Sequence, residues 1–141
     1  MARIELVHSP HWTTICILGD LSRDEIIDAV KLHYPSIATR DVIWDISLGS
    51  MDTLLSKDFA AIAQETKAVK RNAHGGKTAF VGSTAMVFTL ACMYASVAVD
   101  EGVPAEYNAF RSLAEAEQWI QTDETSGGQI PDSTGVNQSI F

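Results

Sequence analysis

The segment of residues 42–56 constrains the fold most strongly, because it joins a buried strand to an amphipathic helix through a polar loop. Residues 42–46 are apolar except for Asp45, a pattern typical of a central strand that is covered on both faces. After the loop, side chains that suit an inner helix face recur at helical spacing: Leu55, Phe59, Ile62, Thr66 and Val69. Such a joint directs backbone N–H groups and the positive end of a helix dipole toward one place, which suits an anion or a phosphorylated hydroxyl.

Two strands are predicted before this joint and two after it. Residues 3–8 alternate between apolar and polar side chains, and residues 12–18 are rich in β-branched side chains. These two segments predict a hairpin around a turn at residues 9–11. Further short strands are predicted at residues 78–81 and 105–110.

Helices are predicted between the strands. Ser22 and Glu25 have the spacing of a capping box, and Ser112 and Glu115 have the same spacing before the last helix. The apolar run at residues 84–99 predicts a third, strongly buried helix. The resulting order, β-β-α-β-α-β-α-β-α, predicts an α/β fold in which helices pack on a mixed sheet of about five strands.

Length and composition predict one domain over residues 1–121, followed by a loop-rich tail over residues 122–141. The chain has 141 residues, of which 46% are hydrophobic, and this is enough for a single buried core. The tail loses all periodicity because Gly, Ser, Thr and Pro dominate it.

The charge and the cysteines indicate an ordinary cytoplasmic protein. The net charge of −8 argues against a nucleic-acid partner, which would require a basic surface. No signal-peptide pattern opens the chain, and the longest apolar run is shorter than the roughly 20 residues of a membrane span. Cys16 and Cys92 are far apart in the sequence and both are predicted to be buried, as thiols in a reducing compartment are.

The sequence resembles the STAS superfamily, and within it the SpoIIAA-like domains related to anti-sigma factor antagonists. The resemblance covers roughly residues 3–121 and depends on residues 44–47 (Trp-Asp-Ile-Ser), 51–53 (Met-Asp-Thr) and 110–120. It implies a bacterial-type regulatory domain without enzymatic activity, which acts through contact with a protein partner. It also implies that a hydroxyl in the loop is phosphorylated.

The resemblance makes the loop after residue 46 the candidate switch and partner-binding loop. Its candidate residues are Asp45, Ser47, Ser50, Asp52, Thr53 and Ser56. Thr53 is the leading phosphate acceptor because it follows a Met-Asp pair as the family's serine does, although leucines follow it here. A phosphate would add about −1.5 to −2 charges and so alter a docking surface. The alternative is that Asp52 or Ser56 only caps the following helix.

The helix predicted at residues 84–99 is apolar nearly all round, so it requires cover on more than one side. The residues that could form this second apolar contact are Met86, Leu90, Met93, Tyr94 and Val97. The cover could be ordinary core and the tail, a second protomer in a homodimer, or a small apolar ligand. The last case defines the alternative function, a carrier or sensor of a small apolar or lipid-like molecule.

No other motif indicates catalysis, a cofactor or a metal. Gly75-Gly76-Lys77-Thr78 lacks the first glycine of a phosphate-binding loop and precedes a strand, so it predicts a helix-terminating turn. His8 and His11 flank a turn without nearby ligands, which predicts solvent-facing side chains. Cys92 has only apolar neighbours and no base, so it predicts an inert thiol. We therefore expect a protein without enzymatic activity, metal or cofactor.

Overall fold

The computed structural model describes residues 2–69 and 76–122. The predicted tail lies outside the described residues except for Thr122, and Gly75 of the Gly-Gly-Lys-Thr segment lies outside them as well. The domain boundary at residue 121 therefore stays a prediction.

The described residues form five strands, four α-helices and one short 3-10 helix. In chain order these are β1 (Arg3–His8), β2 (Trp12–Asp20), α1 (Arg23–His33), η1 (Tyr34–Ser36), β3 (Asp41–Ser50), α2 (Ser56–Ala68), β4 (Lys77–Val81), α3 (Ala85–Asp100), β5 (Glu106–Phe110) and α4 (Leu113–Ile120). This order confirms the predicted α/β fold class.

All five strands belong to one sheet, in which neighbours in the sequence are neighbours in space. The order is β1-β2-β3-β4-β5, with β1 antiparallel to β2 and every other pair parallel. The mixed sheet and the central position of β3 are as predicted. Because β2 to β5 run in one direction, the loops that precede all four α-helices lie at the same, carboxyl edge of the sheet.

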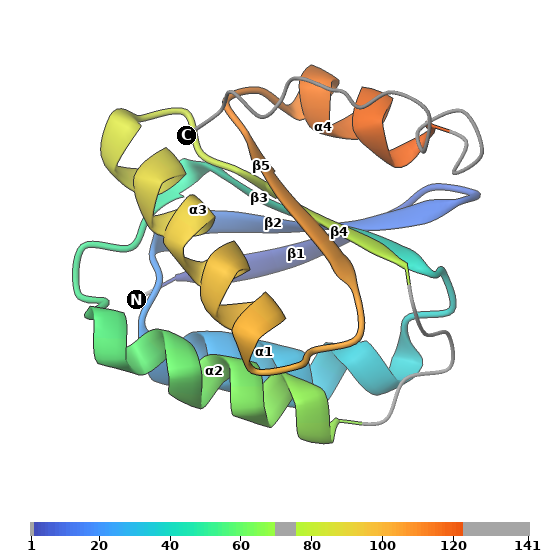
Figure 1. The fold of residues 1–141 in the computed structure, drawn as a ribbon. Helices are drawn as coiled ribbons and strands as arrows, with labels where there is room; N and C mark the ends of the chain where they lie inside the picture. The colour runs from blue at the N-terminus through green and yellow to red at the C-terminus, as the bar shows by residue number, and fades with distance from the viewer. Residues whose placement is uncertain (1, 70–75, 123–141) are drawn as a thin grey trace.

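The helices cover the two faces of the sheet unequally. Helices α1, α2 and α3 lie on one face, and α4 lies alone on the other (Figure 1). The larger core cluster fills the three-helix face and includes Ile15, Trp44, Phe59 and Phe80. A smaller cluster around Ile43 packs under α4. The apolar pattern of β3 follows from this arrangement, since the strand is covered on both sides.

Strand β3 is longer than the sequence predicted. It continues to Ser50, so Asp45 lies in the middle of the strand, and the prediction that Asp45 ends it is wrong. The reason is pairing with β2, which resumes with Leu18 opposite Leu48 after a register shift between Cys16 and Leu18, and extends to Asp20. Tight approach there depends on Gly49, where a Cβ atom would lie 2.9 Å from the carbonyl oxygen of Gly19.

Two smaller expectations are met in part. The capping box at the start of α1 is confirmed: the Glu25 amide donates to the Ser22 hydroxyl, and the Ser22 amide donates to the Glu25 carboxylate. Cys16 and Cys92 are half-buried, so the prediction that both are buried is met only in part.

Candidate functional site

The segment that connects β3 to α2 forms a tight turn with an exposed tip. The Leu54 amide donates to the Met51 carbonyl oxygen at 3.1 Å, which closes the turn. Met51 and Leu54 are buried, with 5% and 6% of their surface exposed, whereas Asp52 and Thr53 between them are exposed. We call residues 51–54 the anchored turn. Thr53 thus has an accessible hydroxyl three residues before α2 begins.

The cap of α2 differs from both candidates that the sequence offered. The Leu55 amide donates to the Asp58 carboxylate at 2.9 Å, and Arg23 lies 3.8 Å from the other oxygen of the same carboxylate. Asp58 is buried, while Ser56 is exposed at the first helical position. Asp58 therefore satisfies the helix start, and sequence reasoning missed it although an acid three residues after the N-cap is a known signal.

Asp45 and Ser47 form a separate pair on β3. The backbone amide and the hydroxyl of Ser47 both donate to one Asp45 oxygen, at 3.1 and 2.6 Å. Asp45 alternates with Trp44 and Ile46, which belong to the larger core, so it lies on the α4 face of the sheet. Burial raises the pKa of the Cys16 thiol, and the nearby carboxylates of Asp45 and Glu5 raise it further.

The switch residues predicted from sequence thus divide into groups. Asp52 and Thr53 are exposed ahead of α2, and Ser56 is exposed at its first position. Ser50 is half-buried and donates its hydroxyl to Asp20 at 2.7 Å, which ties the ends of β2 and β3 together. The anchored turn is therefore the accessible part of the predicted loop.

The predicted apolar set on α3 also divides, because its members point in different directions. Tyr94 points inward, with ring centroids 5.9 Å from Phe59 and 5.5 Å from Phe80. Leu90 and Val97 are partly buried against the same core. Met86 and Met93 face outward, with 59% and 40% of their surface exposed.

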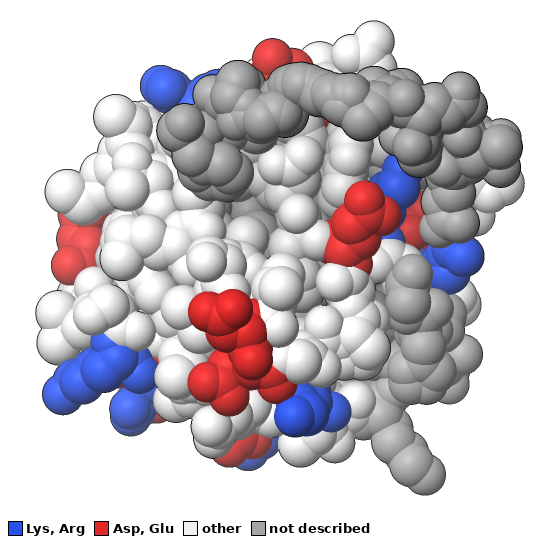
Figure 2. All heavy atoms as spheres, in the orientation of Figure 1, with Lys and Arg blue, Asp and Glu red and all other residues white. Residues whose placement is uncertain are grey.

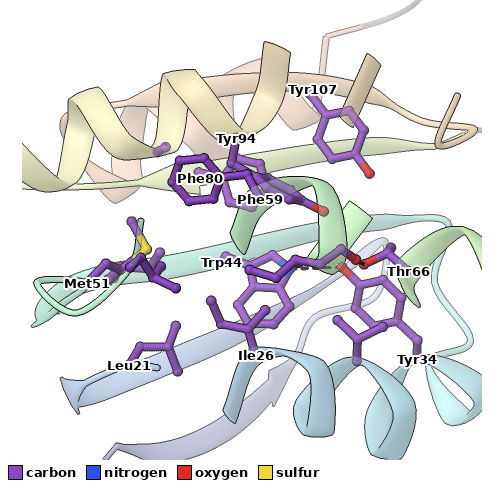
Figure 3. Close-up of a pocket in the computed structure, with 15 residues that line it drawn as sticks. Leu21, Ile26, Tyr34, Trp44, Met51, Phe59, Thr66, Phe80, Tyr94 and Tyr107 are labelled. Atoms are coloured by element: carbon purple, nitrogen blue, oxygen red, sulfur yellow. Dashed lines mark hydrogen bonds between the residues drawn. The ribbon is translucent and has the colours of Figure 1, made fainter. Parts of the chain in front are cut away.

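A small, partly open apolar cavity lies between the sheet and helices α1, α2 and α3 (Figure 3). Its volume is about 40 Å³, which exceeds the minimum for one water molecule but is far below the room that benzene occupies in an engineered cavity. None of the residues that line it carries a charge. They are Leu21, Ile26, Val30, Tyr34, Trp44, Ile46, Met51, Leu54, Phe59, Ile62, Thr66, Phe80, Ala91, Tyr94 and Tyr107.

The two ends of the cavity differ in chemistry. Figure 3 shows Leu21 and Met51 at one end and the hydroxyl groups of Tyr34 and Thr66 at the other. The Trp44 indole N–H donates to the Tyr34 oxygen at 2.9 Å, and the Thr66 hydroxyl donates to a helix carbonyl. Burial raises the pKa of Tyr94 far above its usual value, so its phenol is neutral at physiological pH. The cavity therefore suits an uncharged molecule with an apolar body and one polar group.

The outer side of α3 is a second apolar surface. Figure 2 shows a broad uncharged area over α3, with acidic atoms near the carboxyl end of this helix. Met86, Met93 and Val99 are its large exposed side chains, and a shallow groove beside Met93 extends to Tyr107 of β5. We call the exposed face that holds Met86, Thr89, Met93, Ser96 and Val99 the outer stripe of α3.

Lys77 of the Gly-Gly-Lys-Thr segment is buried, and its ammonium group binds backbone carbonyl oxygens of the protein itself. Only 5% of its surface is exposed, and its ammonium donates to the carbonyl oxygens of Trp119 and Thr122 at 3.0 and 2.7 Å. The same nitrogen lies 5.1 Å from the centre of the Trp119 ring. Lys77 therefore closes the carboxyl end of α4.

The described residues hold neither a metal-ligand cluster nor a membrane-spanning helix. Residues 2–69 and 76–122 hold no group of three or more His, Cys, Asp or Glu side chains placed to bind a metal ion. His8 lies 3.4 Å from the Thr13 hydroxyl at the hairpin. Across the same part of the chain, no helix has the length and apolar character needed to cross a membrane.

Comparison with known proteins gives a likeness of fold. No protein-family model matches the chain, and no curated protein matches it significantly. Among solved structures, it is similar to an uncharacterised protein of the DUF3478 family from Shewanella loihica PV-4, described as having a SpoIIAA-like fold. The TM-score is 0.48 and the identity 13%, over 84% of this chain and 93% of the other. That description names the same fold as the family that the sequence resembles.

Proposed function

We propose that this protein is a regulatory domain without enzymatic activity, which acts by protein–protein contact through the anchored turn. The observation that carries this proposal is the contrast between the exposed Asp52 and Thr53 and the buried Met51 and Leu54 beside them. A tip held by buried neighbours presents its side chains in a defined geometry, which lowers the entropy cost of docking.

Thr53 is the acceptor that this proposal assigns for phosphorylation. A phosphate there would add about −1.5 to −2 charges beside the carboxylate of Asp52. The combined charge would strengthen binding to a basic partner surface or repel an acidic one, so the modification would act as a switch.

Site-specific photo-cross-linking tests the contact. A photo-reactive amino acid at position 53 of the full-length chain, expressed in its own cells, should trap one partner. The matched control places the same group at position 38, an exposed alanine just before β3 at the opposite edge of the sheet. Identical cross-linked species from the two positions would contradict a contact at the turn. A substrate screen whose confirmed hit disappears with one polar substitution would overturn the non-enzymatic assignment.

A second candidate function is a carrier or sensor of a small, uncharged, apolar molecule. The specific observation in its favour is the apolar cavity, with aromatic walls, hydroxyl groups at one end and no charged lining residue. Native mass spectrometry of freshly purified protein tests it. A stoichiometric bound molecule supports the carrier, and a mass equal to that of the chain alone counts against it.

The outer stripe of α3 is the surface that we assign to self-association. Two copies packed with their α3 helices antiparallel would bring Asp100 of each near the positive start of the other helix, where Arg111 also lies beside Phe88. Pairing through the edge strand β5 is less favourable, because the Asn108 side chain already accepts the Ala109 amide at 2.8 Å.

A further inference from the structure

The anchored turn and the cavity share two residues. Met51 and Leu54, which hold the turn, also line the apolar end of the cavity (Figure 3). The exposed Asp52 and Thr53 lie between them in the sequence. Any displacement of Met51 and Leu54 from the cavity wall therefore moves the tip of the turn as well.

The cavity as it stands is too small for an organic ligand, so the wall must move to admit one. Its volume is about 40 Å³, whereas benzene is held in engineered cavities of about 150 Å³. Most lining residues lie in strands or helices, whose backbone hydrogen bonds resist displacement.

The turn is the part of the wall that can move at least cost. Its single internal backbone hydrogen bond joins Leu54 to Met51, and the unbranched side chain of Met51 adapts readily to a changed cavity shape. The other wall residues outside the strands and α-helices are tied more firmly: the Leu21 amide donates to Ser50 at 2.8 Å, and the Tyr34 hydroxyl accepts from Trp44.

We propose that the anchored turn is the gate of the cavity, so that ligand binding and the closed, partner-binding form of the turn exclude each other. The inference rests on both functions proposed above and states how they are coupled. The ligand is uncharged, with an apolar body directed toward Met51 and one hydroxyl or N–H group directed toward Tyr34 and Thr66. By reciprocity, a change that stabilises the closed turn weakens ligand binding by the same factor.

The test is a titration of the full-length, ¹⁵N-labelled protein with hexanol, followed by NMR. The indole N–H signal of Trp44 reports on the cavity, and the backbone amides of Asp52 and Thr53 report on the turn. We expect both sets of signals to shift along one saturation curve. Met51→Ala should tighten hexanol binding because it enlarges the apolar end. Leu48→Ala, on β3 just before the turn but 74% exposed, should leave the affinity unchanged.

A second variant tests the reverse direction of the coupling. Position 53 is three residues before the first residue of α2, so we expect the positive start of the helix to favour a carboxylate there and to stabilise the closed turn. Thr53→Asp should therefore weaken hexanol binding roughly two- to fivefold. Because Thr53 is exposed, this variant is expected to fold normally.

The possible results distinguish failure of the gate from failure of the ligand site or of the partner contact. Shifts at Trp44 with none at Asp52 and Thr53, or equal hexanol affinity in Thr53→Asp and the wild type, would overturn the gate while leaving the ligand site standing. No shift at Trp44 in either the wild type or Met51→Ala would overturn the ligand site and the gate together. Partner cross-linking at position 53 is measured separately, so its failure is recognised independently.

Discussion

At the scale of single residues, the buried Lys77 shows how a polar group can hold two elements together. Its ammonium satisfies two carbonyl oxygens at the end of α4. Lys77→Met would keep the length of the side chain but leave these carbonyls without their donor, so we expect a loss of about 1–3 kcal/mol in the free energy of unfolding. Urea denaturation measures this, with Lys57→Met on the exposed side of α2 as control. Equal stability of the two variants would contradict the role of Lys77.

The buried phenol of Tyr94 should make the stability of the protein depend on pH in the alkaline range. Burial raises the pKa of its phenol in the folded state above the usual value of 10.0, so the folded state holds the proton more tightly than the unfolded state. Its contribution is complete below pH 10 and is lost as the pH rises above it. Melting temperatures at about pH 9 and about pH 11 should therefore differ more for the wild type than for Tyr94→Phe. The same difference in both proteins would show that another group causes the alkaline loss.

At the scale of elements, two substitutions near the start of α2 show whether Asp52 caps this helix or belongs only to the exposed tip of the turn. Asp58→Ala removes the acceptor of the Leu55 amide and should lower the free energy of unfolding by about 0.5–2 kcal/mol. Asp52→Ala should change it by less than about 0.5 kcal/mol, because Asp52 is exposed at the tip of the turn. A larger effect at Asp52 than at Asp58 in thermal or urea unfolding would return Asp52 to the role of cap.

If the outer stripe of α3 mediates self-association, a charge placed on it should disrupt a dimer. Met93→Glu places a charge at the centre of the outer stripe and should convert a dimer into a monomer in light scattering at micromolar concentration. Leu32→Glu, on α1 and 71% exposed, adds the same charge away from the stripe and should leave the mass unchanged. A wild-type protein that is already monomeric under these conditions, with no change in Met93→Glu, would remove the proposed self-association.

At the scale of the whole molecule, local patterns in the sequence were sufficient for the order of the elements and the central place of β3. Alternation and helical spacing are properties of neighbouring residues, and the element order predicted from them is confirmed. Of the two predicted capping boxes, the one at Ser22 is confirmed, and at Ser112 the hydroxyl accepts the Glu115 amide. The true end of β3 was missed because it depends on pairing with β2 beyond the register shift between Cys16 and Leu18. Leu55, assigned to the inner side of α2, is 57% exposed because it precedes the helix.

The candidate site was less accessible to sequence reasoning than the fold. The hydroxyls near Thr53 were found because they follow one another in the chain. The cavity brings together residues from several helices and strands, so no local pattern indicates it. The double role of Met51 and Leu54, as anchors of the turn and as cavity wall, likewise appears only once the chain is folded.

The affinity of the cross-linked partner for the full-length protein tests the central proposal most directly. The dissociation constant is measured for the wild type, for protein phosphorylated at Thr53, and for Ala38→Asp. The last variant is the control, because it also adds negative charge but at the other edge of the sheet. A charge at the docking tip should change the dissociation constant by about tenfold or more, equivalent to about 1.4 kcal/mol, while Ala38→Asp should leave it unchanged. Equal dissociation constants for all three proteins would contradict a regulatory contact at the anchored turn.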